Sequence, residues 1–217
     1  MNRINLFITE ANGNLSNQKR LIERAVKIAQ GYAFSKLKIN WEIDLVVTNR
    51  VYDFVILEDG VGGRTYTSDF ILVSIDEERI QEGILSEILV HELCHAARWG
   101  KNDERMETLL DGIINEGIAT AFEVEFSKNN SKQQFFLKTV VNRLEDENKK
   151  IFSVLRDNLQ DRRYDYQTIF FGGNQELPRW SGYSLGYYIV KKYLDQTSKN
   201  IEDAFADEYA KIGAVLE

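Results

Sequence analysis

The stretch of sequence that decides the fold is 80–99, IQEGILSEILVHELCHAARW, which contains His91-Glu92-Leu93-Cys94-His95. Apolar residues recur in it at positions 84, 85, 88, 89 and 93, a spacing that predicts an amphipathic helix. Residues four apart on a helix project from the same face, so His91 and His95 should lie one above the other. They are also the only two histidines of the chain.

This histidine spacing suits a metal ion. Two imidazole nitrogens at i and i+4 can reach one zinc ion at about 2.0–2.1 Å each. Glu92 lies one position along, where it can take a proton from an activated water instead of binding the ion, and H-E-x-x-H on a helix is the metalloprotease pattern. Two histidines placed at random would be four apart in only about 1% of arrangements, so two histidines that merely pack in a helix are a poor explanation.

A third ligand is expected to be a carboxylate. A catalytic zinc takes three protein ligands, no histidine is left, and Cys94 is angled away from the face that His91 and His95 share. The best candidate is Glu116, because the apolar residues around it in 113–119 (IINEGIA) favour an inward-facing position over a solvated one. The rival carboxylates are Glu104, Glu107, Asp111 and Glu123.

The reach to Glu116 depends on where the next helix begins. If that helix began at Asp103, Glu116 would lie about 20 Å from the turn and overshoot His95. If it begins at Thr108, with Thr108 and Asp111 as a capping-box-like pair, the distance falls to about 12 Å. We therefore expect a charged loop over 100–107 and a second helix over 108–127.

The rest of the chain predicts an αβ part (1–76) and a mainly helical part (77–217) within a single domain, 1–217. Strands are expected at 5–10, 41–48, 53–58 and 70–75, and an amphipathic helix at 16–32. The glycine-rich segment 58–65 lacks a following Gly-Lys-Ser/Thr and is expected to be a plain hairpin loop. Gly172, Gly173 and Pro178 interrupt the helical part.

Composition excludes several classes of protein. With 27 Lys+Arg against 34 Asp+Glu the net charge is −7, which disfavours a dedicated nucleic-acid binder. A single cysteine excludes an internal disulfide and a cysteine-based metal cluster. Residues 1–14 lack a secretory apolar segment and no stretch approaches a membrane span, so we expect a cytoplasmic protein without a membrane partner.

The motifs carry a family resemblance. His91 to His95, with Glu116 lying 21 residues beyond His95, resembles the gluzincin arrangement of zinc peptidases. More closely, it resembles a bacterial family of predicted Zn-dependent proteases, a domain of unknown function that adds a Gly-Tyr-x-x-Gly segment, here 182–186. The match covers roughly 66–193. It implies a zincin-like α+β fold, with a small mixed β-sheet packed on the H-E-x-x-H helix, and hydrolysis of peptide bonds.

The sequence departs from the thermolysin-like pattern at Thr120, where an Asp would steady a zinc-bound histidine. Asp111, Glu123 or a backbone carbonyl must take that role. An oxyanion formed from the substrate also needs a donor besides the metal, and no histidine is spare. Tyr183 and Tyr187 are the candidates, with Arg179 behind them; alternatively, these aromatic residues belong to a helical core.

Two classes of function compete on these motifs. The first is a zinc-dependent metallopeptidase that hydrolyses peptides or unfolded protein, with Glu92 as general base. The alternative is a catalytically silent zinc-binding regulatory or interaction protein, against which the intact Glu92 argues; a metal-free structural helix comes third. The zincin resemblance also implies that strand 70–75 is an edge strand that pairs with extended substrate. The net charge favours basic or neutral peptides. The sequence leaves the cleavage specificity, the oligomeric state and the choice among divalent ions open.

Overall fold

A computed structural model describes residues 3–102, 105–128 and 134–216. The chain forms two compact units, one of 1–102 with 122–136 and the other of 103–121 with 137–217. Helix α3 (Leu109–Ser127) passes through both, so its first part belongs to the second unit and its end to the first. The single-domain organisation stays a prediction.

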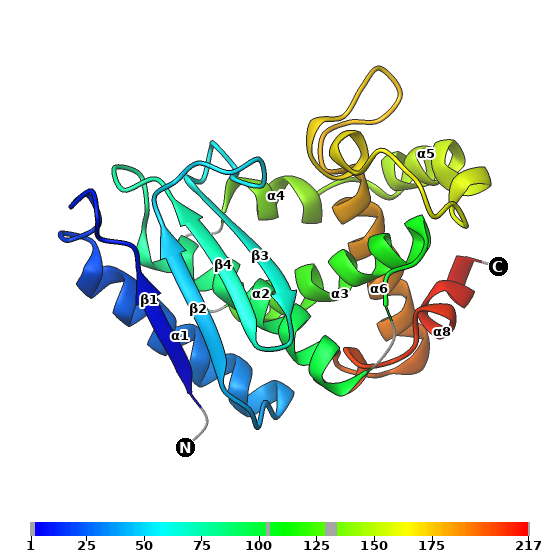
Figure 1. The fold of residues 1–217 in the computed structure, drawn as a ribbon. Helices are drawn as coiled ribbons and strands as arrows, with labels where there is room; N and C mark the ends of the chain where they lie inside the picture. Colours follow the sequence, from blue (N-terminus) through cyan, green and yellow to red (C-terminus); the bar gives the residue numbers. More distant parts are fainter. Residues whose placement is uncertain (1–2, 103–104, 129–133, 217) are drawn as a thin grey trace. The chain divides into compact units, whose positions relative to one another are not determined.

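The first unit contains a four-stranded sheet in the order β1-β2-β4-β3 (Figure 1). Its strands are β1 (Ile4–Ile8), β2 (Ile43–Thr48), β3 (Val61–Thr67) and β4 (Phe70–Ile75). β1 and β4 run parallel to β2, and β3 runs antiparallel to β4. The predicted mixed sheet, and with it the α+β fold, is confirmed.

Three details of the predicted sheet are wrong. Strand 70–75 is not an edge strand, because β4 pairs with β2 on one side and β3 on the other. The glycine-rich segment is not a plain loop, since Val61 begins β3. Residues 53–58 form turns, in which Ile56 makes only an isolated bridge to Val61.

Helices α1 (Lys19–Leu37) and α2 (Glu82–Lys101) pack on each other, and α2 also packs on β3 and β4. The predicted alternation of β2 is confirmed, because Ile43, Leu45 and Val47 are all buried. Every α2 residue from 84 to 98 is buried, so the helix that carries both histidines is enclosed on all its faces.

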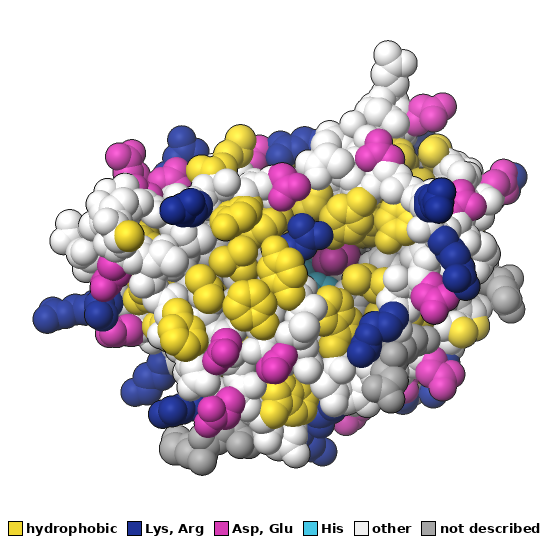
Figure 2. All heavy atoms as spheres, in the orientation of Figure 1, with side chains coloured by type: hydrophobic (Ala, Val, Ile, Leu, Met, Phe, Trp, Pro, Cys, Tyr) yellow, Lys and Arg dark blue, Asp and Glu magenta, His cyan; other side chains and the backbone are white. Residues whose placement is uncertain are grey.

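The opposite face of the sheet is partly apolar and exposed. Figure 2 shows hydrophobic side chains gathered over the strands. Phe7, Tyr66 and Phe70 are exposed, and the last two rings lie 5.7 Å apart. The sheet therefore has one buried face and one open face.

Helix α3 begins as expected. The Asp111 carboxylate accepts a hydrogen bond from the Thr108 backbone N–H at 2.9 Å, and the Thr108 hydroxyl accepts one from the Asp111 N–H at 3.3 Å. This reciprocal pair satisfies two N–H groups that a helix start leaves open, which explains why the helix begins here. The expected loop over 100–107 is wrong at its start, because α2 continues to Lys101, and residues 103–104 lie outside the described residues.

The second unit is helical. Around α3 it contains α5 (Glu145–Leu155), α6 (Ser181–Thr197), α7 (Ile201–Ala204) and α8 (Tyr209–Gly213), and α4 (Phe135–Val141) runs into it from the first unit. A π-helix at Thr168–Gly172 precedes α6. Helices α3 and α6 cross closely at Gly117 and Gly186, where a Cβ on Gly117 would lie 2.2 Å from a backbone carbon of Gly186. Among the described residues, no helix is both long and apolar enough to cross a membrane.

Candidate metal centre

Both histidines project from one face of α2, as their spacing predicts. His91 and His95 are 3% and 6% exposed, and their Nε2 atoms lie 3.1 Å apart. Two nitrogens bound to one tetrahedral zinc at 2.0–2.1 Å would be separated by about 3.3 Å. The imidazoles are therefore already close to the geometry in which they share an ion.

Glu123 fixes the orientation of one of these imidazoles. Its carboxylate lies 3.0 Å from His91 Nδ1 and accepts a second hydrogen bond from Gln134 Nε2 at 2.6 Å. An ionised carboxylate only accepts, so Nδ1 carries the proton and the lone pair of His91 is on Nε2. This is the outer-shell support that metal-binding histidines need.

The supporting acceptor is thus one helical turn beyond Thr120, where the thermolysin-like pattern has its Asp. The Thr120 hydroxyl is buried and has no hydrogen-bond partner among the described residues. Asp111, the other carboxylate that we considered for this role, caps α3. Of the three options, the structure therefore brings Glu123 to His91.

Glu116 lies on the same face of α3 as Glu123, since seven residues are almost two full turns. One ligand atom each of His91, His95 and Glu116 lies within 4.8 Å of the others, and all three residues are buried. The phenol hydroxyl of Tyr166 lies 3.4 Å from Glu116 Oε1. The group on α2 and α3 thus combines two imidazoles and one carboxylate.

The rival carboxylates have other contacts. Glu107 pairs with Arg162 at 2.8 Å, Asp111 caps α3, and Glu123 accepts from His91. Glu104 lies outside the described residues. These contacts leave Glu116 as the candidate ligand that the described geometry supports.

Strand β3 lies directly against Glu92. The Thr65 hydroxyl lies 2.7 Å from Glu92 Oε2 and 2.9 Å from its backbone oxygen, within donating distance of both. A Cβ on Gly63 would lie 2.4 Å from Glu92 Cγ, so only glycine leaves room for this side chain. The sheet edge therefore positions the proposed general base.

Burial raises the pKa values of two carboxyl groups, those of Glu87 and Glu123. Burial, together with the nearby charge of Glu123, raises the pKa of Glu87 to about 7, although Glu87 accepts hydrogen bonds from the Gln134 N–H and the Ser127 hydroxyl. Burial also raises the pKa of Glu123, against its contact with His91. Gln134 thus binds two buried carboxylates at once.

Cys94, inside the motif, is buried, and burial raises the pKa of its thiol to about 12. A thiol kept protonated in this way is a poor metal ligand, because metals bind the thiolate. This agrees with the expectation that Cys94 has no part in the ligand set.

The predicted oxyanion donors all lie in the second unit. Tyr183 is in the first turn of α6, is 9% exposed, and meets Phe170 and Phe171 edge-on at 5.6 and 6.2 Å. Tyr187 lines a cavity of about 320 Å³ beside α5. The Arg179 guanidinium lies 4.2 Å from the centre of the Trp180 ring. Their catalytic roles stay predictions.

Comparison with known proteins agrees with the motif and the geometry. A family model described as "Predicted Zn-dependent protease (DUF2268)" matches residues 16–214. The chain belongs to this family. The chain is also similar to "Uncharacterized protein YjaZ" of Bacillus subtilis (strain 168), with 30% identity over 139 residues. This match covers 63% of the chain and about half (51%) of the relative. No solved structure matches significantly.

The sequence alone does not indicate three residues that contact carboxylates of this site, which are Thr65, Gln134 and Tyr166. Thr65 lies two positions after Gly62-Gly63, in the segment 58–65 that the sequence predicts to be a loop. Only its place on β3, beside α2, shows that it contacts Glu92. Gln134 contacts Glu123, which lies 11 positions earlier in the chain, and Tyr166 contacts Glu116, which lies 50 positions earlier. No local pattern marks either residue.

Proposed function

We propose that this protein is a zinc-dependent peptidase. The observation that carries the proposal is the convergence of three buried ligand atoms, from His91, His95 and Glu116, within 4.8 Å of one another. Family membership supports it, because the family is described as predicted Zn-dependent proteases.

The donor set fits zinc. Two neutral imidazoles and one carboxylate form a known catalytic zinc set, which leaves a position for water or substrate. The contact with Glu123 gives His91 the tautomer that exposes Nε2 to an ion. When bound, zinc acidifies water and polarises the scissile carbonyl.

Within this proposal Glu92 moves the proton. One carboxylate oxygen accepts a proton from the attacking water and then passes it to the nitrogen of the leaving amine. The Thr65 hydroxyl holds Oε2 and orients the carboxylate for both transfers. Tyr183 is the proposed donor to the developing oxyanion, and Tyr187 and Arg179 stay as substitutes.

Metal content tests the ligand set first. Purified protein is stripped with a chelator, reloaded with zinc, and analysed for bound metal and for its melting temperature. We expect about one zinc per chain and a higher melting temperature after reloading, because a ligand of the folded state stabilises it. Glu116→Gln should lose the zinc, while Glu125→Gln, an exposed carboxylate on the same helix, should retain it.

Turnover tests the peptidase. A quenched-fluorescence peptide library is incubated with the zinc-loaded protein and with Glu92→Gln. We expect the variant to bind zinc and to cleave about 10²–10⁴-fold more slowly, the usual contribution of a general base. Stoichiometric zinc with no cleavage that depends on Glu92 would favour the silent zinc-binding protein instead.

A further inference from the structure

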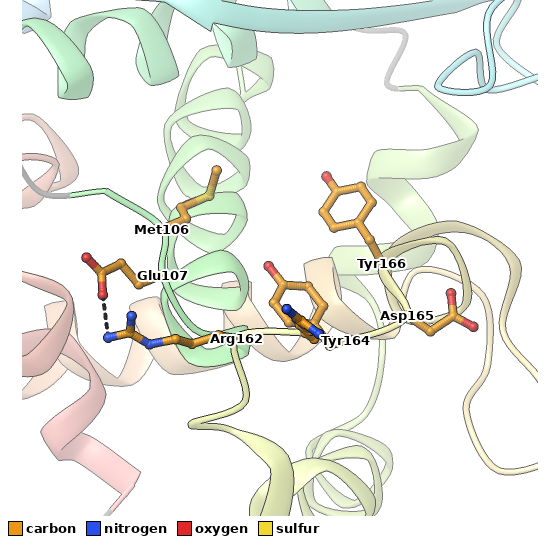
Figure 3. Close-up of a pocket in the computed structure, with 7 residues that line it drawn as sticks. Met106, Glu107, Arg162, Tyr164, Asp165 and Tyr166 are labelled. Atoms are coloured by element: carbon orange, nitrogen blue, oxygen red, sulfur yellow. Dashed lines mark ion pairs between the residues drawn. The ribbon is translucent and has the colours of Figure 1, made fainter.

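The second unit contains an open pocket of about 580 Å³ (Figure 3). Met106, Tyr164 and Tyr166 supply its apolar surface. Its charged lining residues are Glu107, Arg162, Arg163 and Asp165. The Tyr166 hydroxyl, 3.4 Å from Glu116 Oε1, connects this wall to the proposed metal ligand.

The charged residues that line the pocket differ in their polar contacts. Glu107 and Arg162 pair with each other at 2.8 Å, as the dashed line in Figure 3 marks. Asp165 accepts hydrogen bonds from the Thr168 N–H and hydroxyl, at 3.0 and 2.7 Å. Arg163 makes no hydrogen bond or ion pair within the described parts of the chain. The formal charges of these four residues sum to zero, and Arg163 is the one charged residue of the described lining whose side chain has no polar partner.

The walls of the pocket are firmly held. Tyr166 stacks on Phe170 with ring centres 4.5 Å apart. The Tyr164 hydroxyl fits against Gly112 of α3, where an added Cβ would lie 2.8 Å from it. The two rings beside Arg163 therefore present an ordered aromatic surface, against which the stem of a substrate side chain can pack.

We propose that this pocket binds a carboxylate of the peptide substrate, with Arg163 as its counter-ion and the aromatic surface as its apolar wall. Arginine suits this role because its planar guanidinium can donate two parallel hydrogen bonds to a carboxylate. The carboxylate belongs either to an acidic side chain or to the C-terminus of a short peptide. This inference rests on the proposed peptidase function, and it opposes the preference for basic or neutral substrates that the net charge of −7 suggests.

The test compares matched peptides. One series places Glu, Gln or Lys at each position around the cleaved bond, and a second series carries either a free C-terminal carboxylate or an amide. We expect Arg163→Ala to lower kcat/KM about 10-fold for the peptides that bear the recognised carboxylate and to leave their Gln or amide counterparts unchanged. Arg163→Glu should reverse the preference towards Lys. Whichever series responds identifies the source of the carboxylate.

Arg156→Glu is the control, since it makes the same charge change at an exposed site that does not line the pocket. An unchanged Glu-to-Lys preference in Arg163→Glu, or an equal change in Arg156→Glu, overturns the proposal. If the wild type cleaves no peptide, the peptidase function fails separately. Binding of the same labelled peptides, measured by fluorescence anisotropy, then decides for the pocket: weaker binding of only the carboxylate-bearing peptides in Arg163→Ala supports it, and equal binding rejects it.

Discussion

Glu87 should make the stability of the metal-free protein fall as the pH rises, and Glu87→Gln should remove that dependence. The carboxyl is fully buried one helical turn before His91, and its pKa is raised from 4.5 to about 7. Below pH 4.5 the folded and unfolded chains both hold this proton. Between pH 4.5 and 7 only the folded chain holds it, so stability falls with pH; above 7 both have lost it and the loss is complete.

The magnitude follows from the shift. A raise of about 2.5 pKa units corresponds to a total loss of about 3.4 kcal/mol. Titration curves with these two pKa values put about 2.5 kcal/mol of the loss between pH 5 and pH 8. Glutamine keeps an oxygen that can accept from the Gln134 N–H or the Ser127 hydroxyl and has no charge to desolvate.

The assay is urea unfolding of chelator-treated protein at half-unit steps from pH 5 to pH 8. The free energy of unfolding of Glu87→Gln, relative to wild type, should rise by about 2.5 kcal/mol across this range. Glu125→Gln loses one exposed carboxylate of α3 and should stay parallel to wild type. A Glu87→Gln curve that also runs parallel to wild type would refute the reasoning and move the titration to another group.

Three further perturbations follow from close contacts and burial. Gly63→Ala should retain zinc but cut turnover by about 10–1,000-fold, because the new Cβ would displace the Glu92 carboxylate; unchanged cleavage of the peptide library would contradict this. Cys94 should react with a thiol reagent on the order of 10³-fold more slowly in the folded than in the urea-unfolded protein, since its thiol pKa is about 12; equal absorbance traces would be the contrary result. Gly117→Ala should lower the free energy of unfolding by at least about 1–3 kcal/mol, because its Cβ would meet the backbone of Gly186; a urea midpoint equal to that of wild type would show that the helices separate freely.

Local patterns in the sequence predicted much of this architecture. The i, i+4 histidines define the candidate ligand face of α2, and the Thr108–Asp111 pair marks the start of α3, because both depend on helical geometry alone. The alternation along β2 likewise predicted its buried face. Features of this kind need no knowledge of distant parts of the chain.

The remaining features depend on pairing between distant segments. The strand order places β3, and not β4, at the sheet edge. Neither Gly62-Gly63 in β3 nor the apolar residues 70–75 of β4 encode that order locally. Thr65 comes to Glu92 only through this pairing. Several carboxylates could support His91 on the sequence alone, and only the tertiary contact with His91 selects Glu123.

The contact between His91 and Glu123 restricts insertions and deletions between Glu116 and Glu123. Glu116 and Glu123 are seven residues apart on one uninterrupted helix, so the acceptor lies about 10 Å along the axis from the proposed ligand and almost on the same side. Inserting or deleting a single residue between them would rotate one carboxylate by about 100° relative to the other. Relatives that keep this support should therefore preserve the interval itself, with an acceptor seven positions after the ligand, even where the residues between the two differ.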